Sequence, residues 1–248
     1  MSDDAHAEPG TVPLAPRTQP ARAEGVLSRD HERVRELLYA TFRGQPRPIL
    51  LGSNFGIPGA SIWSGARLWV GAFRELGLTP GDRVGLCLPR TPAHVMATIA
   101  SWWEGLCVCP CAVDSSADII SSRELACRVV VGHGAGCLRP GHDEEPHDLS
   151  SVEVDAVPPM RDCAIEFRGE RGVEVDPPPA RAIRVGYADL LRHLDMHAAT
   201  PNDDALIAVT PWHSFRGMFI ELWPALVQGR TLAVEDVPEI RGADARAA

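Results

Sequence analysis

The stretch RELGLTPGDRVGLCLPRTPAHV, residues 74–95, contains the strongest local signals for the fold of this chain. Gly77 stands where a glycine would end a helix, and residues 79–82 (TPGD) are typical of a tight turn. The next six residues, Arg83–Leu88, have the apolar pattern of a buried strand. Thr91 followed by Pro92 is typical of a helix start. The stretch therefore predicts a helix, a turn, a strand and a second helix, in that order.

The same alternation extends in both directions along the chain. Apolar residues recur at helical spacing from Ser61 to Leu78, and a second helix runs to Trp103 before a strand at Leu106–Cys111. Alternating helices and strands are typical of α/β proteins, so we expect an α/β fold with a mostly parallel sheet flanked by helices. The remaining expected elements are helices from Ser28 onwards, at Ser121–Cys127 and at Tyr187–Met196, and strands at Ile49–Leu51, Arg128–Val131, Cys163–Ile165, Leu206–Val209 and Thr231–Val234.

The pattern indicates one domain with irregular ends. Residues 1–26 are rich in Pro, Ala, Asp and Glu without hydrophobic periodicity, so we expect a disordered tail. The domain is expected to span residues 27–237, with a long polar connection at about residues 138–162. Residues 238–248 are expected to be a frayed C-terminal tail.

Composition excludes several classes of function. The chain has 248 residues and a formal net charge of -9, which argues against binding to nucleic acid or to an anionic membrane surface. The most apolar stretch, Val95–Val113, is interrupted by Glu104 and Pro110, so no membrane span is expected. No secretory signal is visible and the seven cysteines are an odd number, which indicates a reducing, cytoplasmic location.

Residues 74–95 closely resemble the opening of the adenylate-forming superfamily, which includes acyl-CoA synthetases, fatty-acyl-AMP ligases and peptide-synthetase adenylation domains. Further segments resemble the family in the same order, over roughly residues 30–236. The resemblance implies the N-terminal subdomain of the adenylate-forming fold. The other segments that carry it are Trp102–Pro110, Arg128–Val131, Val185–Leu191 and Ala208–Met218.

The phosphate-binding loop of that family is altered here. The family holds ATP phosphates with a loop rich in Gly, Ser and Thr, whereas this chain has FRGERGVEVD at residues 167–176. The hydroxyl groups are gone, and two carboxylates, Glu170 and Glu174, stand beside the expected anion. The residues that could retain a degenerate phosphate loop are Phe167, Arg168, Gly169 and Gly172, with Arg181 near the position of the family lysine.

Every basic side chain other than histidine is an arginine, so the chain has no lysine to activate a substrate carboxylate as the family does. The sequence also stops before the adenine-binding segment, the ribose-binding acidic residue and the mobile C-terminal domain of that family. Acyl-adenylate formation requires cations around the transferring phosphate. We therefore expect no adenylation by this chain alone, and no cofactor.

The segment Trp212, His213, Phe215, Arg216 and Gly217 follows a predicted strand at the carboxyl edge of the sheet, where open α/β folds place ligands. In the family, the matching histidine or aromatic residue borders the acyl or aryl pocket. Two interpretations are open. His213 lines a residual pocket and acts as a general acid or base, with Arg216 meeting a carboxylate, or the aromatic residues pack a vestigial cleft.

Three other groups are weaker candidates. Cys107, Cys109 and Cys111 alternate along one strand and should share a face; they could bind a soft metal or include a catalytic thiol served by His213, but small buried hydrophobic residues are the preferred interpretation. His193 and His197 have i, i+4 spacing and are expected on a solvated helix face. The glycine-rich residues 132–136 are expected to be an ordinary loop. We predict no metal site.

The leading hypothesis is a non-catalytic pseudoenzyme that serves as an accessory or partner-binding subunit in a biosynthetic pathway. Its partner would be a second copy of the chain, a full adenylating enzyme or a carrier protein, because a shortened fold exposes apolar faces. One alternative is a repurposed enzyme that acts on an acyl or aryl carboxylate or thioester near His213. Another is the N-terminal half of a split adenylating ligase.

Overall fold

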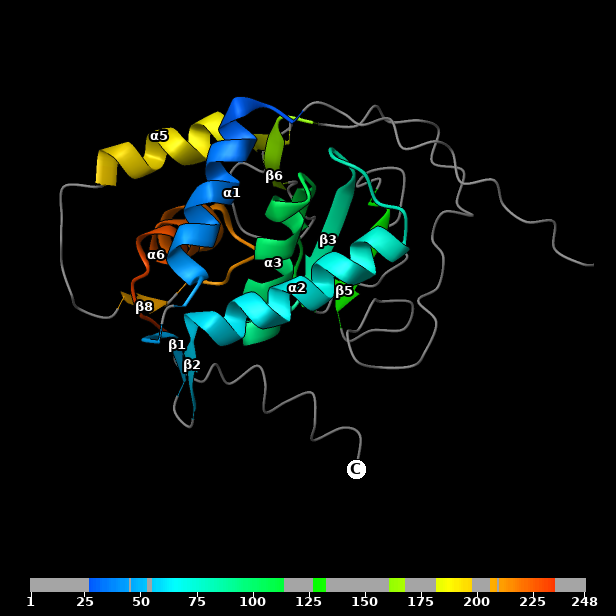
Figure 1. Cartoon of the computed structure of the whole chain (residues 1–248). Coiled ribbons are helices and arrows are strands. Elements are labelled where there is room, and N and C mark those ends of the chain that lie inside the picture. Colours follow the sequence, from blue (N-terminus) through cyan, green and yellow to red (C-terminus); the bar gives the residue numbers. More distant parts are fainter. Residues whose placement is uncertain are drawn as a thin grey trace, which may run out of the picture.

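The computed structural model describes residues 27–44, 46–52, 55–113, 127–132, 161–167, 182–197, 206–208 and 210–234. Figure 1 shows the helices and strands of this part of the chain. In chain order they are α1 (Arg29–Phe42), β1 (Pro48–Gly52), β2 (Phe55–Pro58), α2 (Gly59–Glu75), β3 (Arg83–Cys87), α3 (Pro92–Trp103), β4 (Cys107–Pro110), β5 (Val129–Gly132), β6 (Cys163–Phe167), β7 (Ile183–Gly186), α5 (Tyr187–His197), β8 (Leu206–Ala208), η2 (Arg216–Leu222), α6 (Trp223–Gln228) and β9 (Leu232–Val234).

The strands form two sheets rather than one. The larger sheet has the order β5-β3-β4-β6-β7, and its first four strands run parallel. The smaller sheet has the order β2-β1-β9-β8, with β1, β9 and β8 parallel. The predicted α/β fold with a mostly parallel sheet is therefore confirmed. Strands β2 and β7 were not predicted, and both pair antiparallel at the edge of a sheet.

Local signals in the sequence explain where the helices begin and end. Ser28 caps α1, since its hydroxyl accepts the backbone N–H of His31 at 3.3 Å. Gly77 follows α2 with a φ of 69°, the left-handed conformation that ends helices. Helix α3 starts at Pro92, as predicted. The turn after α2 is fixed by Asp82, whose carboxylate accepts the backbone N–H of Thr79 at 2.7 Å.

Helix α3 is the central helix of the fold. It lies between α1 and α2 in Figure 1 and packs against both of them as well as against β3 and β4. Two thirds of its residues are buried, which explains its continuous apolar sequence without a polar face. Near its C-terminal end, the Trp102 ring meets the Trp223 ring of α6 at 5.0 Å. This pair connects the helices that cover the two sheets.

The two faces of the larger sheet differ in chemistry. Val84 and Leu86 of β3 and Val108 of β4 belong to the main apolar core that also contains the buried side chains of α3. The alternate residues, which point to the opposite face, include Arg83, Cys107 and Cys109. A polar and sulfur-rich layer therefore lies behind the core.

Several predictions concern residues outside the described ranges. These are the tails at residues 1–26 and 238–248, nearly all of the polar connection at 138–162, the glycine-rich loop after Gly132 and the expected helix at 121–127, of which only Cys127 is described. Among the described residues, no helix is both long enough and apolar enough to cross a membrane.

Candidate functional site at the carboxyl edge

The predicted ligand segment lies where the two sheets approach each other. Residues 210–215 follow β8 and lead into η2, while Phe167 is the last residue of β6. The Phe215 ring contacts the Phe167 ring, with centroids 5.4 Å apart. Arg90, which follows β3, donates a hydrogen bond to the carbonyl oxygen of Ala208 at 2.5 Å. The carboxyl ends of β3, β6 and β8 therefore meet at this site, which we call the carboxyl-edge site.

Trp212 fills the interior of the carboxyl-edge site. Its side chain is buried, and its ring meets the ring of His94 edge-on, with centroids 5.2 Å apart. His94 lies in the first turn of α3 and donates its Nδ1–H to the carbonyl oxygen of Leu88 at 2.9 Å. His94 was not predicted as a site residue. The signal was its position, six residues after the end of a predicted buried strand at the same sheet edge.

Burial keeps His94 neutral. It lowers the pKa of His94 from 6.5 to about 4, partly offset by the hydrogen bond to Leu88 and reinforced by the nearby charge of His213. His213 itself is half-buried and Phe215 borders on exposed. At neutral pH the packed pair of His94 and Trp212 is therefore uncharged, and His213 lies nearer to solvent.

We expect this histidine to make the protein acid-sensitive. The pKa of His94 is about 4 in the folded state and near 6.5 in the unfolded state. As the pH falls, the unfolded chain therefore binds a proton at this histidine before the folded protein does. The free energy of unfolding should drop by up to about 3 kcal/mol between pH 6.5 and pH 4 from His94 alone. His94→Gln should flatten this part of the stability profile in urea titrations at a series of pH values. An unchanged slope would contradict the assignment.

The rings at the mouth of the site form a continuous aromatic row. Phe215 contacts Phe219 at 5.1 Å, and Phe219 contacts the imidazole of His193 at 4.5 Å. The expectation of a solvated helix face was wrong for His193, which is 4% exposed because α5 packs this side chain against Phe219. Asp195, which lies between the two histidines in the sequence, is exposed, whereas the side chain of His197 lies outside the described part of the structure.

Arg216 is the predicted carboxylate-binding residue, and its side chain is 74% exposed. Its Nε lies 3.7 Å from a carboxylate oxygen of Glu221 within the same chain. Glu221 also accepts the backbone N–H of Thr210 at 3.2 Å and the Thr210 hydroxyl. The carboxylate next to Arg216 therefore belongs to the chain itself. It is that of Glu221, which also holds Thr210 in place at the start of this segment.

Gly217 is required by the tight path of this segment. A Cβ atom at this position would lie 2.2 Å from the carbonyl oxygen of Pro211, which is a severe clash with backbone. The Gly217 N–H donates to the Ser214 hydroxyl at 3.0 Å, and this hydroxyl donates to the same Pro211 oxygen at 2.7 Å. The segment then continues as the π-helical turn η2, a conformation often found at functional sites.

The predicted phosphate loop is described only at its first residue. Phe167 ends β6 and packs against Phe215. Arg168, Gly169, Gly172 and Arg181 lie outside the described residues, as do Glu170 and Glu174. The altered loop therefore stays a prediction from the sequence.

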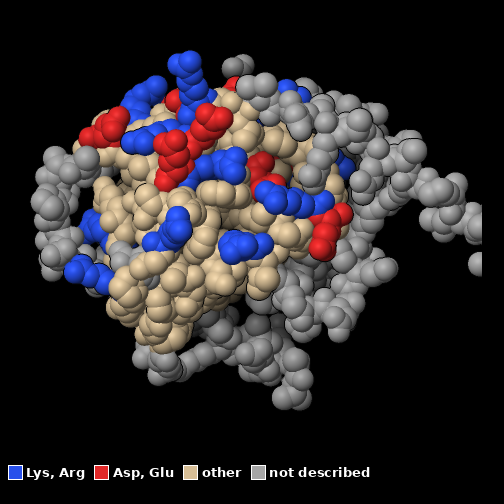
Figure 2. Space-filling model, in the orientation of Figure 1, with Lys and Arg blue, Asp and Glu red and all other residues tan. Residues whose placement is uncertain are grey.

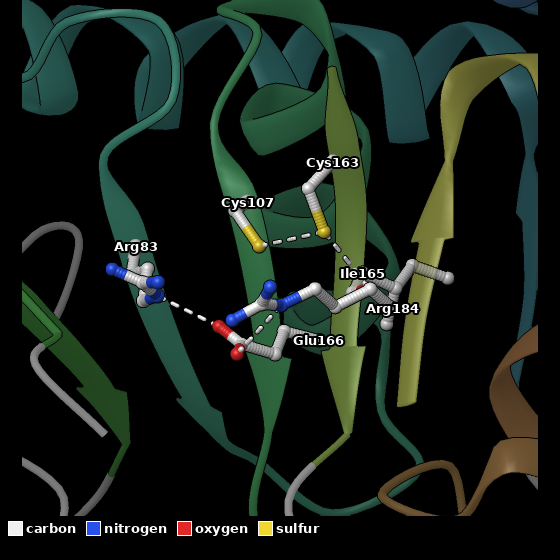
Figure 3. Close-up of polar contacts among 6 residues, drawn as sticks. All are labelled: Arg83, Cys107, Cys163, Ile165, Glu166 and Arg184. Atoms are coloured by element: carbon white, nitrogen blue, oxygen red, sulfur yellow. Dashed lines mark hydrogen bonds and ion pairs between the residues drawn. The ribbon is translucent and has the colours of Figure 1, made fainter. Parts of the chain in front are cut away.

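The cysteines form a separate buried cluster on the larger sheet. Cys107, Cys109 and Cys111 are buried, as predicted, and they share one cluster with Cys87, Cys127 and Cys163. Hydrogen bonds from Cys107 and Cys127 hold the pKa of Cys109 well below its ordinary value. Glu166 lies beside them and pairs with Arg83 at 2.7 Å (Figure 3). The buried thiols were predicted from the sequence, but this buried ion pair was not.

Comparison with known proteins gives matches by structure only. No protein-family model and no curated protein matches the chain. The N-terminal subdomain of NpsA from Klebsiella oxytoca, in complex with 3-hydroxyanthranilyl-AMSN, matches with a TM-score of 0.58 and 13% identity over 82% of this chain and 52% of that chain. A benzoate CoA ligase from Burkholderia xenovorans matches with a TM-score of 0.61 and 16% identity over 82% of this chain and 45% of that chain.

A third match is NpsA-ThdA, an artificially fused Adenylation-PCP di-domain from Klebsiella oxytoca. Its TM-score is 0.58, with 14% identity over 81% of this chain and 39% of that chain. The chain has the fold of the N-terminal part of adenylate-forming enzymes. The resemblance inferred from residues 74–95 is thus confirmed for the fold. The chain spans about half of the length of the solved chains that it matches.

Proposed function

We propose that this protein is a non-catalytic relative of adenylation domains that acts as an accessory, partner-binding subunit in a biosynthetic pathway. The observation that carries the proposal is the packing at the carboxyl-edge site. Trp212 is buried against His94, and Phe215 packs against Phe167. The region where the adenylate-forming family would hold an acyl or aryl group is occupied by rings of the chain itself.

The charges at the carboxyl-edge site support the same proposal. Adenylation needs cations aimed at a phosphate, yet Arg90 is hydrogen-bonded to a backbone carbonyl and Arg216 lies beside Glu221. The sequence supplies no lysine that could replace them. Both arginines therefore hold the loop in place rather than face an anionic substrate.

A groove on the helical surface is the face that we assign to the partner. It has a volume of about 390 Å³ and lies between α1, α2 and α3. Its aromatic residues are Tyr39, Trp63 and Trp103; the rings of Trp63 and Trp103 meet at 4.9 Å. We call it the tryptophan groove. Aromatic residues beside arginine are typical of the energetically dominant parts of protein interfaces.

Arginines surround the tryptophan groove. Arg67 and Arg74 line it, and the guanidinium of Arg35 lies 4.3 Å from the centre of the Trp103 ring. Figure 2 shows arginine side chains spread across this helical face, although the net charge of the whole chain is -9. Arg74 is paired with Glu104 at 2.7 Å, so Arg67 and Arg35 supply the charge that favours an acidic partner surface. A carrier domain is our preferred partner, since an adenylation fold is joined to one in the fused NpsA-ThdA protein.

The absence of adenylation is tested by ATP–pyrophosphate exchange. The purified chain should give no exchange above background with a panel of aryl and fatty acids, because rings of the chain fill the site and the two arginines described there contact acceptors of the chain itself. The benzoate CoA ligase with benzoate serves as the active control. Exchange that depends on both the chain and one acid would overturn the non-catalytic assignment.

The partner role is tested with any synthetase or carrier protein that proves to be encoded beside this chain. We expect one of them to bind, and Arg67→Glu to weaken binding at least tenfold, because a repulsive charge replaces an attractive one in the tryptophan groove. Arg192→Glu, a charge reversal on α5 at an arginine that pairs with Asp189, is the matched control. A monomer that binds none of these proteins in light-scattering and calorimetric titrations would refute the accessory role.

A second candidate function is a repurposed pocket for an acyl or aryl carboxylate or thioester near His213. Two buried polar atoms favour this candidate, Trp212 Nε1 and His94 Nε2. Neither atom has a hydrogen-bond partner among the described residues, so both are available to a ligand. An indole N–H donor and an imidazole acceptor could bind the two ends of a carboxylic acid group. Thermal stabilisation by such acids, lost in Trp212→Phe, would favour this candidate. Stabilisation by ATP with Mg²⁺ would instead favour the split ligase.

A further inference from the structure

The buried face of the larger sheet carries an unusual set of side chains. All six cysteines of the described ranges cluster there, with Val130 as the one other buried member. Glu166 and Arg83 lie on the same face, and both are almost completely buried. Buried cysteines by themselves could simply pack as small hydrophobic residues. That role does not explain why a carboxylate and a guanidinium are buried among them.

Three of these side chains have the arrangement of metal ligands. The sulfur atoms of Cys107 and Cys109 and a carboxylate oxygen of Glu166 all lie within 4.8 Å of one another. Ligands around a tetrahedral zinc ion, with Zn–S bonds near 2.3 Å, are separated by roughly 3.8 Å. The three atoms therefore need to approach one another by only about 1 Å, which rotation about side-chain bonds can supply.

A fourth ligand lies on the neighbouring strand. Cys163 Sγ is 3.5 Å from Cys107 Sγ, close to the separation expected between two sulfur ligands of one ion. Figure 3 shows Cys107 and Cys163 on adjacent strands, with their sulfur atoms pointing toward each other above Glu166. Cys163 lies outside the group of three atoms that are all within 4.8 Å of one another, so its sulfur would have to turn toward Cys109 and Glu166 to supply the fourth ligand.

The charges around these ligands favour a divalent ion. Glu166 accepts from Arg83 at 2.7 Å and from Arg184 at 3.3 Å, so the group carries one net positive charge when the thiols are protonated. Binding of Zn²⁺ would displace the three thiol protons to solvent and form three thiolates. The two positive charges of zinc offset two of the thiolates, and the third offsets the remaining arginine charge. The site as a whole becomes neutral when the 58% exposed Arg184 is counted, whereas a univalent ion held by the same three thiolates would leave it negative.

We propose that Cys107, Cys109, Cys163 and Glu166 bind a structural zinc ion within the sheet. The two arginines keep the Glu166 carboxylate ionised and oriented, as hydrogen-bonding groups around metal ligands do. The site lies on the sheet behind the core, separate from the carboxyl-edge site. Zinc here would connect β4 to β6 and would be acquired as the chain folds.

Cobalt substitution tests the proposal on the full chain. The protein is prepared with a chelator and a non-thiol reductant, the chelator is removed, and Co²⁺ is titrated in. We expect one equivalent to bind, with the thiolate-to-cobalt absorption and strong visible bands of tetrahedral cobalt, and Zn²⁺ to remove these bands. Absence of the bands, together with absence of zinc in protein purified without chelator, would overturn the proposal without any variant.

Two serine variants locate the site. Cys109→Ser should weaken cobalt binding at least tenfold and remove part of the thiolate absorption. Cys111→Ser is the matched control, since Cys111 is buried in the same cluster but lies outside the four ligands. It should bind cobalt as the unaltered protein does. Equal loss in both variants, with both folded by circular dichroism, would contradict the assignment of ligands.

Discussion

Arg83→Met should lower the free energy of unfolding by about 3–5 kcal/mol, the cost of breaking a buried ion pair from one side. Arg83 is 4% exposed, and its Nε donates to Glu166 at 2.7 Å across the intervening strand β4. Methionine fills a similar volume but leaves the fully buried Glu166 carboxylate with Arg184 as its remaining ion-pair partner among the described residues. Urea denaturation with chelator and reductant present measures the effect without a contribution from bound metal.

Two further variants separate charge from packing. Arg184→Met removes the other arginine, which is 58% exposed and 3.3 Å from Glu166, so its loss should cost less than about 1 kcal/mol. The double variant Arg83→Met with Glu166→Leu removes both buried charges and should recover most of the stability. Equal losses from Arg83→Met and Arg184→Met would show that burial does not govern the strength of these pairs.

The main elements of the fold could be predicted because local signals and burial agree. Ser28 and Gly77 mark helix ends by side-chain capping and by a left-handed backbone, both of which are local properties. Strands β3 and β5 are buried on both faces, so apart from Arg83 their sequences are apolar. Nothing beyond neighbouring residues was needed to predict these elements.

The missed strands lack those signals. Strand β2 (FGIP) contains Gly and Pro, which are both unfavourable in strands, and it pairs only at a sheet edge. Strand β7 (IRVG) is also an edge strand with two exposed residues. Short edge strands are determined by pairing with a distant segment, and the sequence does not state which segment that is. For the same reason it did not predict two sheets in place of one.

The carboxyl-edge site was predicted in part. Position after a strand placed Trp212, His213 and Phe215 correctly at the edge, because β-strand direction fixes where the following loop lies. The partners of these residues were not predicted, since His94 and Phe167 approach from segments far away in the chain. The burial of His193 could have been predicted from its neighbours on the helix. It is three residues after the buried Leu190, on the same helix face.

Trp102→Ala should cost about 3–5 kcal/mol, the usual range for removing a buried aromatic side chain. Trp102 is completely buried, its ring meets that of Trp223 at 5.0 Å, and its Nε1 donates to the Ala164 carbonyl at 3.1 Å. The Trp102 side chain thus contacts both α6 and β6 from α3. Its removal would leave a cavity between the helices that pack on the two sheets. Urea denaturation gives the loss, and Trp102→Phe, which keeps a ring but removes the hydrogen bond to the Ala164 oxygen, should cost about 1–3 kcal/mol.

The neighbouring Trp103 provides the matched control for Trp102. Its side chain is half-buried and lines the tryptophan groove, where Trp63 packs against it. Trp103→Ala should therefore cost less than half as much stability as Trp102→Ala, because solvent and neighbouring side chains can fill the space. It should, however, abolish partner binding, whereas Trp102→Phe should leave partner binding unchanged. The opposite pattern would mean that the groove contributes to the core rather than to recognition, and the proposed partner surface would have to lie elsewhere.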